Sequence, residues 1–299
     1  MEPSTVKQHL HLHFVVVLLG FTAILGALIT LPALDLVWYR MLFGFVGLWF
    51  YFMLRRLPYK LTISKILPLM GIGVVVALHW FTFFHAIKLS NVSVTLGVFA
   101  STTLFTSFLE PISQKRKIFW LEVLIGLVII GGIYLIFQYE LRFLSGILYA
   151  LLSALLNGVF VVLNRNISLK HHPSVISFYE MIGGFAFITL YFAITGGLGT
   201  HMLSMQASDL FYLVLLGFVC TAYAFTAIVD IMKVLSAFTV VLAINLEPVY
   251  GIVMARFFFP EAERMSGGFY LGTMIIMISV FSYPFLKRML RRKNQKPVQ

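Results

Sequence analysis

The sequence predicts an all-α polytopic membrane protein, with ten transmembrane helices arranged as two inverted five-helix repeats. Three observations predict this fold: the composition, ten hydrophobic runs and an internal repeat. The chain has 299 residues, of which 60% are hydrophobic and 11% are charged, whereas a water-soluble protein carries about 25% charged residues. At about 20 residues per span, ten helices take about 200 residues. The remainder leaves no room for a sizeable soluble domain.

Ten hydrophobic runs, bounded by charges or by Gly, Pro and Asn, predict the individual helices. The expected ranges are 12–31, 34–54, 66–87, 92–112, 118–138, 143–163, 174–195, 209–231, 236–259 and 266–287. The first run is interpreted as a span rather than a cleaved signal peptide. Only Lys7 precedes it, and no small-x-small cleavage site follows before the second run.

The positive charges predict the orientation in the membrane. The net charge is +11, and cytoplasmic loops of membrane proteins hold an excess of Lys and Arg. With the N-terminus inside, the cytoplasmic side receives Lys7, Arg55, Arg56, Lys60, Lys65, Lys115, Arg116, Lys117, Arg165, Lys170, Lys233, Lys287, Arg288, Arg291, Arg292, Lys293 and Lys296. The outer side keeps Arg40, Lys88, Arg142, Arg256 and Arg264. This asymmetry predicts a multi-pass protein of the inner membrane with both termini cytoplasmic. Orientation in the lipid bilayer accounts for the positive net charge, so no nucleic-acid partner is expected.

An internal repeat divides the chain into two halves and a tail. The segment Trp38–Phe45 aligns with Phe178–Phe185 at an offset of 140 residues. Leu89-Ser90 aligns with Leu235-Ser236, and Ile125-Gly126-Leu127 with Leu271-Gly272-Thr273, both at an offset of 146. The predicted units are residues 12–138, residues 143–287 and a basic cytoplasmic tail at 288–299.

The odd number of helices in each half predicts the function class. After five spans, the second copy enters the membrane in the opposite orientation. Inverted repeats are typical of secondary transporters, whose substrate site lies near the midplane where the halves meet. The sequence therefore predicts a carrier that moves a small molecule by alternating access.

The second half also resembles a known family. The stretch Ala237–Ile252 with its Glu247-Pro248 pair, followed by Glu261 and Gly267–Gly272, resembles the second-half signature of the EamA family in the drug/metabolite transporter superfamily. Ala86–Ser90, Gly126 and Ile130–Gly132 resemble the first-half signature. The resemblance covers residues 12–287 and implies an inner-membrane carrier, commonly an exporter of amino acids or other small metabolites. One departure is that Ser101-Thr102 stands where the offset places a Glu-Pro pair, so Glu110-Pro111 is out of register.

Glu247 is the first candidate for the substrate site because it is expected near mid-bilayer, about eleven residues into its helix. A carboxylate there costs about 2.5 to 3.5 kcal/mol on insertion scales, so it should face protein or water. Two interpretations stay open: Glu247 stabilises a kink at Pro248, or it contacts substrate or a proton. Asn245, two residues earlier, is expected to point elsewhere on the helix.

Aromatic and polar residues on two other helices complete the predicted site. His79, Trp80 and Thr82 lie on the third helix, and Tyr223 occupies the position equivalent to His79 on the eighth at an offset of 144. Aromatic walls with a few polar groups suit a small-molecule pocket, although helix packing explains the same residues. Asn157, inside the sixth helix, either lines the path or hydrogen-bonds a neighbouring helix.

Arg40 and Glu180 occupy equivalent repeat positions and are candidates for coupling or gating. Inversion places Arg40 towards the outside, where it either snorkels to the headgroups or attracts an anion at an outer gate. Glu180 is expected towards the inside, where it either pairs with the basic loops or takes part in proton coupling.

Several other functions find no support in the sequence. His9, His11 and His13 alternate, so on a helix they point to different faces and predict no metal site. No phosphate-binding Gly-Lys-Ser/Thr sequence is present, so neither ATP nor any other cofactor is expected. Two alternatives to a metabolite carrier stay open. One is a nucleotide-sugar or lipid-linked carrier, which needs cations in its cavity to bind phosphate groups, and the other is a membrane-embedded enzyme. Association with a second copy of the chain is left open.

Overall fold

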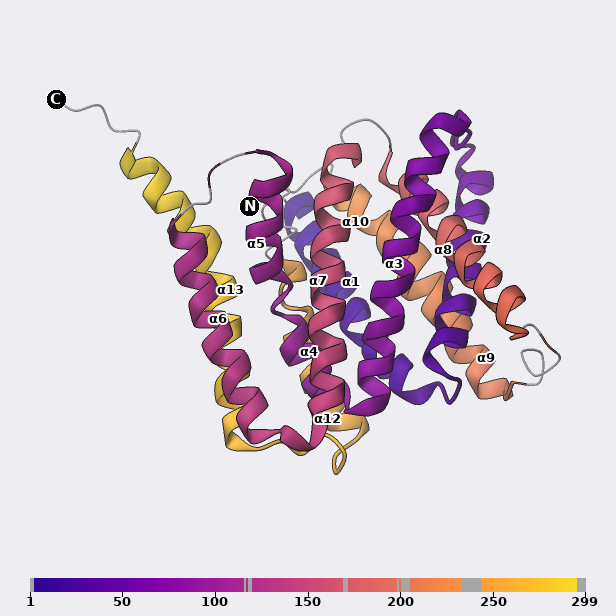
Figure 1. The fold of residues 1–299 in the computed structure, drawn as a ribbon. Helices are drawn as coiled ribbons and strands as arrows, with labels where there is room; N and C mark the ends of the chain where they lie inside the picture. The colour runs from indigo at the N-terminus through magenta and orange to yellow at the C-terminus, as the bar shows by residue number, and fades with distance from the viewer. Residues whose placement is uncertain are drawn as a thin grey trace.

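The computed structural model describes residues 3–115, 117, 120–168, 172–197, 199, 205–232 and 243–294, and all regular structure in these residues is helical (Figure 1). The first half contains α1 (Pro3–Leu28), α2 (Ala33–Arg55), α3 (Ile63–Leu89), α4 (Val92–Phe99), α5 (Thr102–Ser113) and α6 (Trp120–Tyr139). The second half contains the 3-10 turn η1 (Leu141–Phe143), α7 (Leu144–Ser168), α8 (Pro173–Thr195), α9 (Ala207–Val214), the π-helical segment η3 (Leu215–Tyr223), α10 (Ala224–Met232), α12 (Glu247–Phe258) and α13 (Gly267–Asn294).

The helices are those of a multi-pass membrane protein. Within the described residues, eight helical stretches are long and apolar enough to cross a bilayer, with mean hydropathy between 1.4 and 2.3. The apolar part of α13, Gly267–Tyr283, is shorter. Large apolar side chains such as Leu54, Trp120 and Phe257 point outwards, as expected of a surface that contacts lipid tails rather than water.

Most helix ends agree with the expected ranges, and the differences have physical reasons. The prediction that the first helix starts at residue 12 is wrong, because α1 begins at Pro3 and its polar first turns do not prevent helix formation. The π-helical turn at η3 was not expected from the hydrophobic pattern. Some predictions lie outside the described residues: Leu235-Ser236 and the rest of 236–242 in the ninth run, the cations Arg116, Lys170 and Lys233, and residues 295–299 of the tail.

Both termini lie toward one end of the bundle, and the connection between α6 and α7 lies at the other (Figure 1). We call these the termini end and the opposite end. At the centre, α3 packs against α7 and α8, α1 packs against α12, and α2 packs against α8 and η3. Helices α6 and α13 pair at the edge of the bundle (Figure 1). Each of these contacts joins a helix of the first half to a helix of the second half.

Two helices are interrupted inside the bundle. A turn at Ala100 and Ser101 separates α4 from α5, and a turn at Asn245 and Leu246 precedes α12. The expected continuous helices over 92–112 and around Glu247 are therefore wrong at these points. Both interruptions fall well inside the predicted spans, where exposed polar backbone must be covered by protein or water.

Candidate functional site

Glu247 is positioned by the second interruption. It is the first residue of α12, with Pro248 directly after it in the first turn. Proline is tolerated in the first turn of a helix because the backbone N–H that it lacks would have no partner within the helix there. A carboxylate in the first turn interacts favourably with the positive end of the helix dipole. The expectation that Pro248 kinks a continuous helix is therefore wrong. Glu247 is partly buried.

Arg40 lies beside this helix end and not at the membrane surface. Only 4% of Arg40 is exposed, its guanidinium carbon lies 3.6 Å from the centroid of the Trp80 ring, and it interacts electrostatically with Glu247. The expectation that Arg40 snorkels to the headgroups is wrong. The adjacent aromatic face and the electrostatic attraction of the carboxylate together compensate for the burial of the guanidinium.

The π-helical segment η3 supplies the remaining partners of Arg40. The Thr221 hydroxyl accepts a bond of 3.2 Å from Arg40 Nε and donates one of 2.9 Å to the Leu216 carbonyl, five residues earlier. Its neighbour Cys220 is 1% exposed and interacts electrostatically with Arg40. We call Arg40, Trp80, Cys220, Thr221 and Glu247 the central polar cluster. It joins α2 and α3 of the first half to η3 and α12 of the second.

His79 and Thr82 are buried next to this cluster but are engaged in internal contacts. His79 Nδ1 lies 2.9 Å from Ser153 Oγ and 3.1 Å from the Ser153 carbonyl oxygen on α7. Its ring stacks on Phe99, with centroids 5.4 Å apart. The Thr82 hydroxyl lies 2.9 Å from the carbonyls of Leu78 and His79. These residues connect α3 to α7 and to the end of α4.

The other predicted substrate residues are spread along the interface. Asn157 on α7 is partly buried, and its side chain has no hydrogen-bond partner among the described residues. Asn245 lies in the turn before α12. The Tyr223 hydroxyl lies 2.8 Å from His11 Nε2, so Tyr223 contacts α1 rather than His79.

Glu180 is buried in the second turn of α8, apart from the central polar cluster, and its side chain interacts with that of Asn164 on α7. The side chain of Arg165 and the whole of Lys170, two of its expected basic partners, lie outside the described residues.

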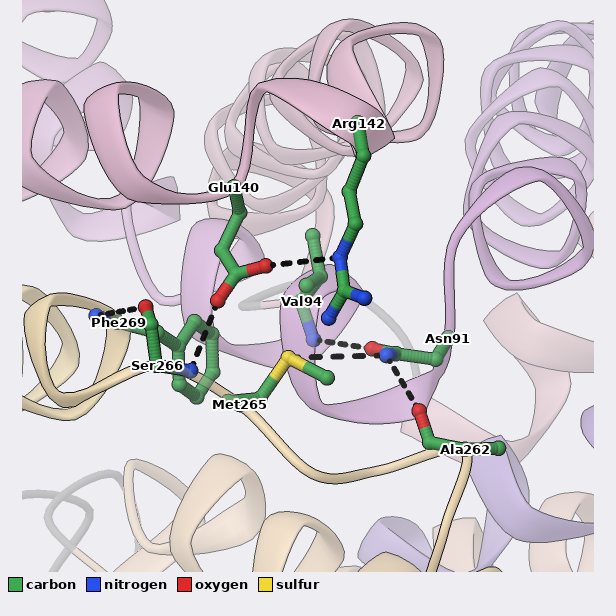
Figure 2. Close-up of polar contacts among 8 residues, drawn as sticks. All are labelled: Asn91, Val94, Glu140, Arg142, Ala262, Met265, Ser266 and Phe269. Atoms are coloured by element: carbon green, nitrogen blue, oxygen red, sulfur yellow. Dashed lines mark hydrogen bonds and ion pairs between the residues drawn. The ribbon is translucent and has the colours of Figure 1, made fainter.

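Polar contacts that sequence reasoning missed close the opposite end of the bundle. Figure 2 shows Glu140 accepting hydrogen bonds from the Ser266 backbone N–H at 2.9 Å and from Arg142 Nε at 3.3 Å. Asn91 caps α4 by accepting from the Val94 N–H at 2.9 Å and donates to the Ala262 carbonyl at 3.0 Å (Figure 2). Asparagine directly before an apolar helix is a cap signal, and this signal was present at Asn91.

Two carboxylates complete this closure. Both oxygens of Glu263 accept bonds of 2.8 Å, one from the Val92 N–H and the other from the Ser93 N–H at the start of α4. Asp209 on α9 accepts from the Thr30 N–H at 2.8 Å and from the Thr30 hydroxyl at 2.6 Å. Each carboxylate joins one half of the chain to the other.

Two hollows among the described residues lie away from the cluster. One, of about 230 Å³, lies between α4, α12 and α13 and is lined by Ser93, Ile252, Val253, Arg256, Phe257, Glu263 and Tyr270. The other, of about 620 Å³, runs along α2 and α8 and includes Phe45, Phe185 and Thr189. The predicted site residues line neither of these two hollows.

Comparison with solved structures and with curated sequences gives the first result. One solved structure, described only as the crystal structure of a protein, is similar to this chain with a TM-score of 0.62 and 17% identity, and the match covers 94% of this chain and 99% of the other. At this identity the match supports the fold alone. No curated protein sequence matches the chain.

The second result concerns the family. The model of the EamA-like transporter family matches residues 144–283, so the resemblance seen in the sequence is confirmed for the second half. The matched region runs from the start of α7 into α13, so the second half of the chain is similar to EamA-like transporters.

Proposed function

We propose that this protein is a secondary transporter in which two inverted five-helix repeats move a small organic metabolite by alternating access. The family match supports the transporter class. The observation that carries the mechanism is the pair of interrupted helices. Ser101 precedes the restart at α5 and Glu247 opens α12, and these residues stand at the 146-residue offset of the repeat. Interrupted helices in corresponding positions mark the substrate site of many transporters.

The central polar cluster is the proposed substrate site, with Asn157, Asn245, His79, Thr82 and Tyr223 along the path. It combines a cation, a carboxylate, a hydroxyl and an aromatic ring at the meeting point of the two halves. A zwitterionic amino acid or a related metabolite has charges complementary to Arg40 and Glu247. Export is the direction that the resemblance implies.

A nucleotide-sugar carrier fits this site less well. Phosphate groups need uncompensated cations, whereas the Arg40 guanidinium faces the Trp80 ring, donates to Thr221 and interacts with Glu247. The closure at the opposite end suits alternating access, because Glu263 and Asp209 must release their partners before that end opens.

A ligand-stabilisation screen tests the proposal. Purified protein is heated with single amino acids and related metabolites, and the shift in melting temperature is measured. Compounds that stabilise the wild type are expected to lose their effect in Trp80→Ala and Glu247→Gln. They should keep it in the matched controls Trp120→Ala, at an outward-facing Trp, and Glu261→Gln, at an exposed Glu. Stabilisation that persists in both site variants would show that the site lies elsewhere.

A further inference from the structure

The two carboxylates inside the spans of α8 and α12 have opposite surroundings. Glu247 interacts with the Arg40 guanidinium, so a negative charge on it is compensated. Glu180 is 1% exposed. Within the described part of the chain, no group of opposite charge interacts with it. An isolated charge is strongly disfavoured inside a membrane protein, so the same residue type is expected to hold different protonation states at the two sites.

The hydrogen bonding around Glu180 is incomplete in a specific way. The side chain of Asn164 interacts with the Glu180 carboxyl group. One oxygen on each side nevertheless has no partner: Oε1 of Glu180 and Oδ1 of Asn164, both buried. Both atoms are acceptors when Glu180 is ionised. A buried polar atom without a partner needs an explanation.

A single proton resolves both deficits. We propose that Glu180 and Asn164 form a proton-binding site and that Glu180 is protonated in this conformation. In the protonated pair, the Asn164 amide N–H donates to one Glu180 oxygen, and the new O–H of Glu180 donates to Asn164 Oδ1. The step is simple addition: a proton from water forms the O–H bond of the neutral acid, and release is the reverse.

The surroundings favour a proton over a metal cation. Metal ions such as Mg²⁺ and Ca²⁺ take six or more oxygen ligands, whereas this pair offers two unpartnered oxygens. The helix faces around α8 are apolar or backbone: Gly73 packs against the Glu180 carbonyl, Met70 against Gly183, and Met41 against Gly184.

The neighbouring helices bring no titratable partner within the described residues. Helix α8 packs against α2, α3 and α10. Their titratable groups include Arg40 on α2, His79 on α3 and Asp230 on α10, and none of them interacts electrostatically with Glu180. The protonation of Glu180 thus depends on burial and on Asn164.

This inference names the coupling ion of the proposed transporter, and that role rests on the proposed function. Infrared spectroscopy tests the proton site without any transport. The chain has only 11 acidic residues, so a neutral carboxyl band is assignable. At neutral pH we expect a neutral carboxyl C=O band in wild type and in Glu247→Gln, its loss in Glu180→Gln, and a frequency shift in Asn164→Leu. Glutamine mimics the neutral acid, so Glu180→Gln should melt at the wild-type temperature. Absence of the band, or its persistence in Glu180→Gln, would overturn the site.

Transport tests the coupling role. Proteoliposomes are loaded with an equimolar mixture of the twenty common amino acids, radiolabelled, and efflux is compared with and without an imposed pH gradient. We expect a several-fold acceleration by the gradient in wild type, and in Glu180→Gln loss of that acceleration with gradient-free exchange retained. The coupling role would be overturned if the efflux rate of the wild type did not change with the pH gradient, or if the gradient still accelerated efflux in Glu180→Gln. Absence of all flux in wild type would count against the proposed function, and the infrared result would still decide the proton site.

Discussion

Arg40 determines how the two halves of the protein meet at the centre of the bundle. Its guanidinium lies over the Trp80 ring of its own half, and in the other half it donates to Thr221 and interacts electrostatically with Glu247. The residue itself was visible in the sequence as the one cation well inside a span. Its surroundings were not, because they depend on the rotation of α2 and on the shape of η3, which hydrophobic patterning does not report.

The first prediction concerns this pair of charges. Arg40→Met leaves the Glu247 carboxylate without its compensating cation, and we expect a loss of about 3 kcal/mol of stability, as when one partner of a buried ion pair is removed. The double variant Arg40→Met with Glu247→Gln should lose less than the sum of the single variants. Thermal unfolding in detergent measures both. Lys65→Met, at an exposed cation, is the control, and additive losses would contradict a direct interaction.

At the scale of elements, the interrupted helices show what hydrophobic patterning can and cannot predict. The expected range 92–112 agrees with the outer bounds of α4 and α5. The turn at Ala100 and Ser101 stayed hidden because hydroxyl residues such as Ser101, Thr102 and Thr103 also occur inside continuous transmembrane helices. At Glu247 a partial signal was present, because a Glu-Pro pair suits the first turn of a helix as well as a kink.

The pairing of α6 with α13 gives the second prediction. A Cβ added at Gly132 would lie 2.9 Å from the Gly272 carbonyl oxygen and 2.7 Å from Ile276, whereas one added at Gly131 meets nothing within 4 Å. Gly132→Ala should therefore destabilise the protein by about 1 to 3 kcal/mol, as overpacking does. Gly131→Ala should be neutral or stabilising by up to about 1 kcal/mol, because Ala favours helix. The melting temperatures of the two variants decide this, and equal shifts would disprove the close approach.

At the scale of the whole molecule, the all-helical membrane fold could be predicted from the sequence because this class of fold depends on composition and span length. Most helices begin and end near the expected residues, with the start of α1 as an exception, and the family match covers residues 144–283. The closure at the opposite end was not predicted. It consists of side chains such as Glu263 bonding backbone N–H groups of the other half, and such pairings leave no periodic trace in the chain.

The third prediction uses Cys220 as a built-in probe. It is the sole cysteine of the chain and is 1% exposed in the central polar cluster. Glu263→Gln removes one charged acceptor at the start of α4, a loss of about 1.5 kcal/mol, so opening of that end should increase about tenfold. We expect faster labelling of Cys220 by a membrane-impermeant maleimide added outside. Glu261→Gln, in the same connection, should label at the wild-type rate. Equal rates in both variants would show that Glu263 does not hold this end closed.

The fourth prediction concerns orientation. The termini share one end of the bundle (Figure 1), and the excess of Lys and Arg predicts that this end is cytoplasmic. A green fluorescent protein fused to either terminus should fluoresce, and alkaline phosphatase inserted between α6 and α7 should be active, since that enzyme folds in the oxidising compartment. Phosphatase activity at a terminus would reverse the assignment.

The π-helical turn has a consequence for anyone who designs variants of the eighth span. An α-helix advances about 100° per residue, whereas a helix closed by i to i+5 bonds advances less. Over Leu215–Tyr223 the angular lag accumulates, so a helical wheel drawn continuously from α9 assigns the wrong faces to α10. Spin labels or cross-linkers on Ala224–Met232 must therefore be phased from Tyr223 onward, with its hydroxyl toward His11 as the reference direction.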